Sequence, residues 1–141
     1  MITVHSYFPD RLLTDEEYKK YRKEIGTNWK QKMRKYIGRL ALKDIYYESK
    51  EGCYGKMIFD GGKLKGVVTY QLYDKYVLVL YLATGEKGYG KRLINEVIKT
   101  ARLIKKYVYI ENALDDSVDF YKKIGGKYKK KDIFNTITFN P

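Results

Sequence analysis

The sequence predicts an α/β fold with a mixed sheet, and three observations carry that prediction. An almost unbroken apolar run, 76–83, leads through a glycine-rich turn into an amphipathic helical segment, 88–105. A further apolar run, 107–110, follows at once, and a strand–helix–strand crossover of this kind makes its two strands parallel. Before them, 54–73 alternates with period two around an Asp-Gly-Gly turn at 60–62, which indicates an antiparallel hairpin.

The N-terminal segment is predicted to hold one strand and a first helix. Residues 2–8 alternate and are rich in residues that favour strands. The sequence 14–17, Thr-Asp-Glu-Glu, is a capping box, so a helix should begin near Asp15. This helix is expected to end near Ile25, with Gly26 as its C-terminal stop.

A second helix is expected to follow directly. Thr27 can cap it, and it should end near Gly38. Its predicted core-facing side chains are Trp29, Met33, Tyr36 and Ile37. Residues 39–51 are ambiguous in pattern, although Leu40, Ala41 and Leu42 favour a helix.

The later elements follow from continuous apolarity and from helical spacing. Because the run 76–83 is almost wholly apolar, it is expected to be a central strand covered on both faces. The stripe expected to be buried on the following helix is Leu93, Ile94, Val97, Ile98, Ala101 and Ile104. Asp115 or Asp116 is expected to cap a short helix, 117–124, that stops at Gly125. The last predicted strands are 127–131 and 133–139.

Composition bounds the class of protein. The chain has 141 residues and 44% hydrophobic content, which predicts one folded domain over 1–141. It has no apolar run of membrane-spanning length and no signal-peptide pattern, so we expect a cytoplasmic protein without a membrane partner. Cys53 and His5 are each the only residue of their type. An internal disulfide, a thiolate cluster, a zinc site and a histidine-activated nucleophile are therefore not expected.

The formal net charge of +12 is unevenly distributed along the chain. One basic cluster is Lys19, Lys20, Arg22, Lys23, Lys30, Lys32, Arg34, Lys35, Arg39 and Lys43, and another is Lys122, Lys123, Lys127, Lys129, Lys130 and Lys131. Such a field favours an acidic partner, namely nucleic acid, a phosphorylated ligand or an acidic protein. A solvated surface with no partner is the other interpretation.

The glycine-rich turn 84–93 carries the clearest chemical signal. The first N–H groups of a helix lack partners and point outward, and the helix dipole adds partial positive charge there. Gly88 and Gly90 let a bulky phosphate approach the backbone, and Lys87, Lys91 and Arg92 add full charges. The turn therefore predicts a phosphate-bearing ligand.

The order of elements, together with two motifs, resembles the GNAT acetyltransferase superfamily over 54–139. Residues 85–90, Gly-Glu-Lys-Gly-Tyr-Gly, match the family's phosphate loop, Arg/Gln-x-x-Gly-x-Gly/Ala. Residues 117–125, Ser-Val-Asp-Phe-Tyr-Lys-Lys-Ile-Gly, match its later helix, Ala-x-x-Phe-Tyr-x-Lys-x-Gly. The resemblance implies a mostly antiparallel sheet flanked by helices, with a splayed parallel strand pair after the central strand. Gly85 departs from the usual Arg or Gln.

The resemblance implies acetyl-CoA as co-substrate, held between the strands that end at Ala83 and Ile110, and no metal. The family's general acid, which protonates the departing thiolate, falls on Tyr121. Three sources of base stay open: Glu111, a water oriented by Tyr81, or an acceptor amine of low pKa. The implied coenzyme-binding residues are Leu80, Leu82, Ala83, Lys87, Gly88, Tyr89, Gly90, Lys91, Arg92, Asn112 and Ser117.

The function implied is an N-acetyltransferase that transfers an acetyl group from acetyl-CoA to a primary amine. In this fold the early helices set acceptor choice, so Trp29, Lys30 and Arg34 are predicted to bind the acceptor. Their charge favours tRNA, a nucleic-acid-associated protein or an acidic protein, and aromatic residues at helical spacing can equally be core anchors. The alternative function is a GNAT-like module that has lost its chemistry and binds nucleic acid or protein. The chain is expected to be a monomer or a homodimer.

Overall fold

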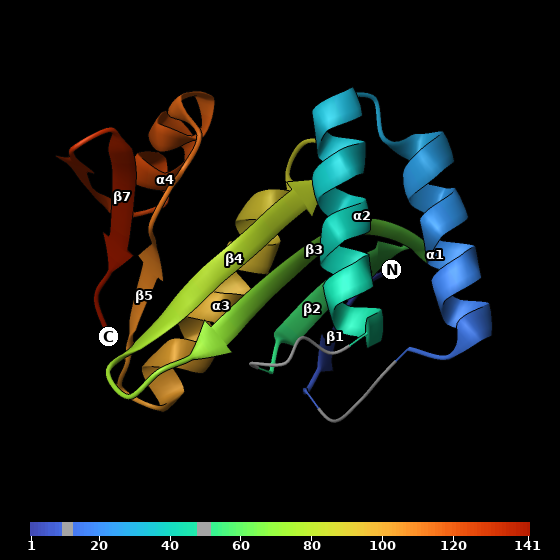
Figure 1. Cartoon of the computed structure of the whole chain (residues 1–141), viewed down its shortest axis with the longest axis horizontal. Coiled ribbons are helices and arrows are strands. Elements are labelled where there is room, and N and C mark those ends of the chain that lie inside the picture. The colour runs from blue at the N-terminus through green and yellow to red at the C-terminus, as the bar shows by residue number, and fades with distance from the viewer. Residues whose placement is uncertain (10–12, 48–51) are drawn as a thin grey trace. The chain divides into compact units, whose positions relative to one another are not determined.

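The computed structural model describes residues 1–9, 13–47 and 52–141. Figure 1 shows the helices and strands, whose order along the chain follows the predicted one. The strands are β1 (Ile2–Tyr7), β2 (Tyr54–Asp60), β3 (Lys63–Leu72), β4 (Tyr76–Thr84), β5 (Tyr107–Ile110), β6 (Lys127–Lys131) and β7 (Phe134–Phe139). The helices are α1 (Asp15–Asn28), α2 (Lys32–Tyr47), α3 (Tyr89–Leu103) and α4 (Val118–Lys123), with a 3₁₀ turn at Asp115–Ser117.

The strands form one sheet in the order β1-β2-β3-β4-β5-β7-β6. β4 and β5 pair in parallel, with Tyr76 opposite Tyr107 and Leu78 opposite Tyr109. The pairs β1–β2, β2–β3, β5–β7 and β6–β7 are antiparallel. The prediction of a mixed, mostly antiparallel sheet with one parallel pair is confirmed.

The chain divides into two compact units, and each is described by itself. The first unit consists of Met1–Gln71 and Leu80–Ile94, and the second of Leu72–Val79 and Asn95–Pro141. The expectation of a single domain over 1–141 stays a prediction. Among the described residues, no helix is both long enough and apolar enough to cross a membrane.

In the first unit, α1 and α2 lie side by side and pack against strands of the sheet (Figure 1). The predicted capping box opens α1: Thr14 Oγ1 accepts from Glu17 N at 3.1 Å, and Glu17 Oε1 accepts from Thr14 N at 3.0 Å. The buried core there is Tyr7, Leu13, Ile25, Trp29, Ala41, Leu42, Ile45, Met57, Phe59, Leu64, Val67 and Ala83.

The predicted boundary between the first two helices is wrong. α1 runs through Gly26 to Asn28, and the Thr27 hydroxyl donates to the carbonyls of Lys23 and Glu24 within α1 instead of capping a new helix. A local glycine cost of about 1 kcal/mol does not end a helix whose apolar side is buried.

The second helix was also placed too early. α2 begins at Lys32 and continues through Gly38 to Tyr47, so a helix over 39–47 is confirmed, whereas 48–51 lie outside the described residues. Met33 and Tyr36 are 60% and 61% exposed, which contradicts their predicted place in the core. The side of α2 that is buried carries Gly38, Ala41, Leu42 and Ile45.

In the second unit, β4, β5 and β7 present alternating faces. Val77, Val79, Val108, Ile110, Ile137 and Phe139 are buried on one side. Residues between them point to the opposite side, where Tyr76 and Tyr107 are 37% and 46% exposed. The prediction that both faces of β4 are covered is therefore wrong, although β4 does occupy the middle of the strand order.

The stripe predicted for α3 is buried from Leu93 to Ala101, but Ile104 lies beyond the helix and is 45% exposed. The predicted aspartate cap of the later helix is also wrong. α4 follows a 3₁₀ turn without a side-chain cap, and Asp115 Oδ1 instead accepts from Asn135 Nδ2 at 2.5 Å.

Candidate active site

The turn between β4 and α3 has the geometry of an anion site. Gly88 has φ +99°, a conformation that side chains rarely adopt, and α3 begins at the next residue, Tyr89. The first turn of α3 holds no acidic residue. Its leading backbone N–H groups have no partner within the helix, so they can donate to a phosphate.

The charges around this turn are favourable for an anion. Glu86, the acid within the turn, is paired with Lys65, whose Nζ lies 2.8 Å from Glu86 Oε1. The hydrogen bond to Glu86 raises the pKa of Lys65. Lys87, Lys91 and Arg92 are exposed and can turn toward a ligand. The residues predicted to bind phosphate thus come together at one helix start in the first unit.

Tyr89 has a structural task that the sequence did not indicate. Its hydroxyl donates to Asp60 Oδ2 at 2.8 Å, tying the start of α3 to the β2–β3 hairpin. This hydrogen bond lowers the pKa of Asp60 and raises the pKa of Tyr89. Tyr89 can therefore contribute its backbone N–H to the anion site while its side chain holds the turn in place.

Trp29 is a core residue of the first unit, only 1% exposed, so it offers no surface to an acceptor. The prediction that it contacts the acceptor is corrected in favour of the core-anchor interpretation. Within the described part of the chain, its buried Nε1 has no hydrogen-bond partner. Lys30 and Arg34 are exposed nearby in sequence, and their contact with an acceptor stays a prediction.

The end of β4 belongs to the first unit. Leu80 is 36% exposed, Leu82 is half-buried and Ala83 is buried. Tyr81 is half-buried and packs against the core of this unit. Gly85, the residue directly after β4, donates its N–H to Lys65 O of β3 at 3.1 Å, so the chain stays hydrogen-bonded to β3 beyond the end of β4.

In the second unit, Tyr121 lies on α4 and is 6% exposed. Burial raises the pKa of its hydroxyl to about 12, so the group keeps its proton and can donate a hydrogen bond at neutral pH. The ring of Phe120 contacts it edge-on, with centroids 5.0 Å apart. Ser117, predicted to bind coenzyme, is half-buried and directly precedes α4.

Glu111 and Asn112 follow β5 directly, and both are exposed. The chain after them is held by Asn135 of β7, a buried residue that the sequence analysis missed. Asn135 Nδ2 donates to Ala113 O at 3.0 Å and to Asp115 Oδ1, while its Oδ1 accepts from Tyr128 at 2.9 Å. An isolated Asn within a predicted strand gives no sequence signal for this contact.

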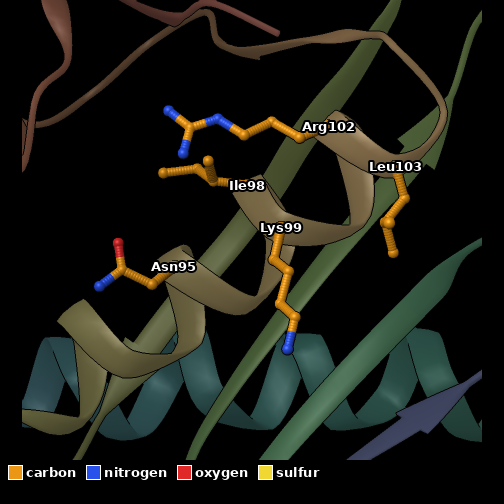
Figure 2. Close-up of a pocket in the computed structure, with 5 residues that line it drawn as sticks. All are labelled: Asn95, Ile98, Lys99, Arg102 and Leu103. Carbon is orange, nitrogen blue, oxygen red and sulfur yellow. The ribbon is translucent and has the colours of Figure 1, made fainter.

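The second unit also holds a cavity of about 350 Å³ along α3. Figure 2 shows Asn95, Ile98 and Arg102 pointing to the same side of the helix, while Lys99 and Leu103 point elsewhere. Two of the five lining side chains are cationic and none is acidic, so the lining favours an anionic group. None of these residues was predicted to belong to a site.

Gly88 and the buried Tyr121 each lie within one of the two motifs that carry the resemblance to the GNAT superfamily. A model of the Acetyltransferase (GNAT) family matches residues 12–126, and the chain belongs to this family. No curated protein sequence matches the chain.

Solved structures of the same fold cover nearly the whole chain. An N-acetyltransferase from Staphylococcus aureus is 14% identical, with a TM-score of 0.65, and the match covers 99% of this chain and 97% of the other. The PaiA N-acetyltransferase from Thermoplasma acidophilum, solved in complex with coenzyme A, is 18% identical, with a TM-score of 0.63 and coverage of 96% and 97%. ElaA of Escherichia coli is 14% identical, with a TM-score of 0.61 and coverage of 98% and 97%. At these identities the likeness shows the fold alone.

Proposed function

We propose that the protein is an N-acetyltransferase that uses acetyl-CoA to acetylate a primary amine. The observation that carries the proposal is the β4–α3 turn, with Gly88 at φ +99° and an α3 start that has no acidic residue in its first turn. Membership of the GNAT family supports the same chemistry. The coenzyme A bound to the PaiA protein is a further reason to choose this ligand.

The residues of the turn fit a diphosphate. The N–H groups of Lys87 to Lys91 would hold its oxygens, and the side chains of Lys87, Lys91 and Arg92 would neutralise its charge. Pairing of Glu86 with Lys65 removes the repulsion that a free carboxylate in the turn would cause. Leu80 and Leu82 would offer backbone groups of β4 to the pantetheine arm.

Acetyl-CoA supplies an activated thioester carbonyl that an amine can attack directly, so the enzyme needs no nucleophile of its own. Tyr121 would donate to the sulfur as negative charge develops there. With a pKa of about 12, its hydroxyl is a weaker acid than an ordinary thiol, whose pKa is about 8.5. We therefore assign Tyr121 hydrogen-bond donation to the departing thiolate, with proton transfer completed by solvent.

The proton of the attacking ammonium must also leave. Glu111 is an exposed carboxylate at the carboxyl end of β5 and would accept this proton directly or through a water. Tyr81, which packs against the core of the first unit, is the alternative to Glu111 and would act by orienting a water that takes the proton. An acceptor whose amine has a low pKa would lessen the demand on either residue.

Calorimetric titration with acetyl-CoA tests the proposal. Gly88→Asp should abolish binding, because it places a carboxylate and a strained residue at the anion site. Gly61→Asp is the matched control, since Gly61 also has a positive φ and open space around it but lies in the β2–β3 hairpin. Circular dichroism checks that both variants fold. Absence of heat with the unaltered protein at millimolar acetyl-CoA would refute the proposal and favour the non-catalytic binding module.

A further inference from the structure

The second unit contains a groove on the exposed side of its sheet. The groove has a volume of about 500 Å³ and is lined by Lys75, Tyr76, Leu78, Tyr107, Tyr109, Glu111 and Thr138. A volume of this size is within the range of small-ligand sites. Apart from Glu111, none of these residues was assigned a role from the sequence.

The strand register explains why these side chains meet. Tyr76 is opposite Tyr107 and Leu78 is opposite Tyr109 across the parallel pair, and Thr138 of β7 is opposite Tyr109 on its other side. Residues directly opposite each other in neighbouring strands share a face of the sheet. The intervening Val77 and Val108 are buried on the reverse face, so the tyrosine side is left open.

The floor of the groove is aromatic and ordered by ring contacts. Tyr76 stacks on Tyr73 with centroids 5.0 Å apart, and it meets Tyr109 in a T-shaped arrangement at 5.9 Å. These contacts hold the rings in place before any ligand arrives. Aromatic faces attract both apolar groups and ammonium ions.

The two ends of the groove carry opposite charges. Lys75 directly precedes β4, and its carbonyl accepts from Tyr107 N at 3.1 Å, which fixes it beside the start of β5. Glu111 lies beyond the other end of β5. Because Tyr76 is opposite Tyr107, Lys75 is level with Lys106. Glu111 is five residues further along the chain, so Lys75 and Glu111 are roughly 16 Å apart along the strand direction.

We propose that this groove binds an elongated amine that ends in a carboxylate, with the ammonium at Glu111 and the carboxylate at Lys75. The apolar body of the ligand lies over Tyr76, Leu78 and Tyr109. An extended peptide of about four to five residues has a matching length, since each residue spans about 3.3–3.6 Å. The proposal rests on the proposed function and deepens it, because the bound ammonium is the acceptor amine. The net charge of +12 favours the anionic end of such a ligand.

The test uses a tetrapeptide, Ala-Ala-Leu-Ala, in four forms: with free ends, N-acetylated, C-amidated, and blocked at both ends. Calorimetry with the full chain should show tightest binding for the form with free ends. Blocking either end should weaken binding roughly fivefold, the effect of removing one solvent-exposed charge pair. Tyr109→Leu should weaken all four forms alike, because it removes the aromatic floor and neither charged end.

Two charge variants assign the ends of the ligand. Glu111→Gln should bind the free and N-acetylated peptides equally while still distinguishing the C-amidated form. Lys75→Gln should lose only the distinction between the carboxylate and the amide. Asp119→Asn and Lys129→Gln change exposed charges outside the groove and should leave all four affinities unaltered.

The outcomes separate this proposal from the proposed function, because acetyl-CoA is titrated into the same samples. Acetyl-CoA binding without peptide binding, or peptide binding that Glu111→Gln and Lys75→Gln do not alter, would overturn the groove proposal alone. Peptide selectivity of the expected pattern without acetyl-CoA binding would support the groove and refute the acetyltransferase. If the end preferences are exchanged between the two variants, the proposed orientation is wrong.

Discussion

The indole of Trp29 lies directly against the backbone of Gly85, so closely that a Cβ atom at Gly85 would be 2.4 Å from Trp29 Cδ1. Gly85 is the position where the GNAT phosphate loop usually has Arg or Gln. Its departure from the family pattern therefore has a structural reason: this chain places a buried tryptophan where another member would carry a side chain. The start of the phosphate loop and the core of the first unit depend on each other through this one contact.

Gly85→Arg, which restores a residue typical of the family, should destabilise the protein and should not improve coenzyme affinity. Any side chain there must displace the indole, and overpacking of a core costs about 1–3 kcal/mol. Urea unfolding measures the free energy of unfolding, and calorimetry with acetyl-CoA measures the affinity. A variant that is equally stable and binds acetyl-CoA more tightly would show that Gly85 weakens the loop.

Gly38→Ala should also be destabilising, against the usual preference for Ala in helices. A Cβ at Gly38 of α2 would lie 2.4 Å from Trp29 Cζ3, so we expect a loss of about 1–3 kcal/mol. Gly26→Ala in α1 is the matched control, because its nearest neighbour is only the mobile end of the Arg39 side chain at 2.9 Å. That variant should be neutral or gain up to about 1 kcal/mol.

The double variant Trp29→Phe/Gly38→Ala tests the cause. Phenylalanine lacks the distal ring atoms that the new methyl group would meet, so Gly38→Ala should cost less in the Trp29→Phe background than alone. Equal costs in both backgrounds, measured by urea unfolding, would rule out the indole as the source of the effect.

Patterns within one segment predicted most of the fold. The hairpin around 60–62 and the strand–helix–strand unit of β4, α3 and β5 each follow from local periodicity and turn residues, and the capping box at Thr14 fixed the start of α1. The end of α1 and the start of α2 were misplaced because both depend on how Trp29 packs. Its indole fits against Gly38 and Gly85, which lie in other parts of the chain and have no side chain in its way. Periodicity and capping motifs within one segment cannot predict such a contact between distant segments.

In the candidate site, too, the residues within one segment could be predicted, whereas contacts between distant segments could not. The proposed phosphate loop is contiguous in sequence, so its residues could be named from one motif, and the role proposed for Tyr121 came from a second motif. The groove could not be predicted, because Tyr76, Tyr109 and Thr138 meet only through the register of three strands. In a chain with 16 tyrosines, composition does not distinguish those that line a groove from those in the core.

Tyr121→Phe should lower kcat by roughly 100-fold and leave acetyl-CoA affinity nearly unchanged, because it removes a hydrogen-bond donor that acts on the developing thiolate. Since burial raises the pKa of Tyr121 to about 12, its ionisation should produce no fall in kcat below about pH 11. Steady-state rates against pH measure this. Tyr54→Phe, which also removes one tyrosine hydroxyl but lies in β2 outside the proposed site, is the control and should keep full kcat.

If Tyr121→Phe reduced kcat and coenzyme affinity equally, Tyr121 would be a packing residue. A fall in the rate of the unaltered enzyme near pH 10 that disappears in Tyr121→Phe would show instead that the hydroxyl ionises far more easily than its burial implies.

Stability should fall in alkaline solution, partly because of one buried thiol. Burial raises the pKa of Cys53 from 9.0 to about 11, and it raises the pKa of Tyr70 from 10.0 to about 12. Between pH 9 and 11 the unfolded state releases the thiol proton while the folded state retains it. The contribution is therefore fully present below pH 9 and is lost as the pH rises toward 11. At pH 10 the thiol alone should cost about 1.4 kcal/mol, and Tyr70 a few tenths more.

Urea unfolding at pH 8 and pH 10 measures the loss, and Cys53→Ala isolates the thiol. Deprotonation of lysines and tyrosines affects both proteins alike, so the free energy of unfolding of Cys53→Ala should fall by about 1.4 kcal/mol less than that of the unaltered chain. The same burial predicts slow reaction of the folded protein with thiol reagents at pH 8, since the thiolate is the reactive form. Identical pH dependence in the two proteins, together with rapid thiol modification, would mean that Cys53 is not held in the core as a protonated thiol.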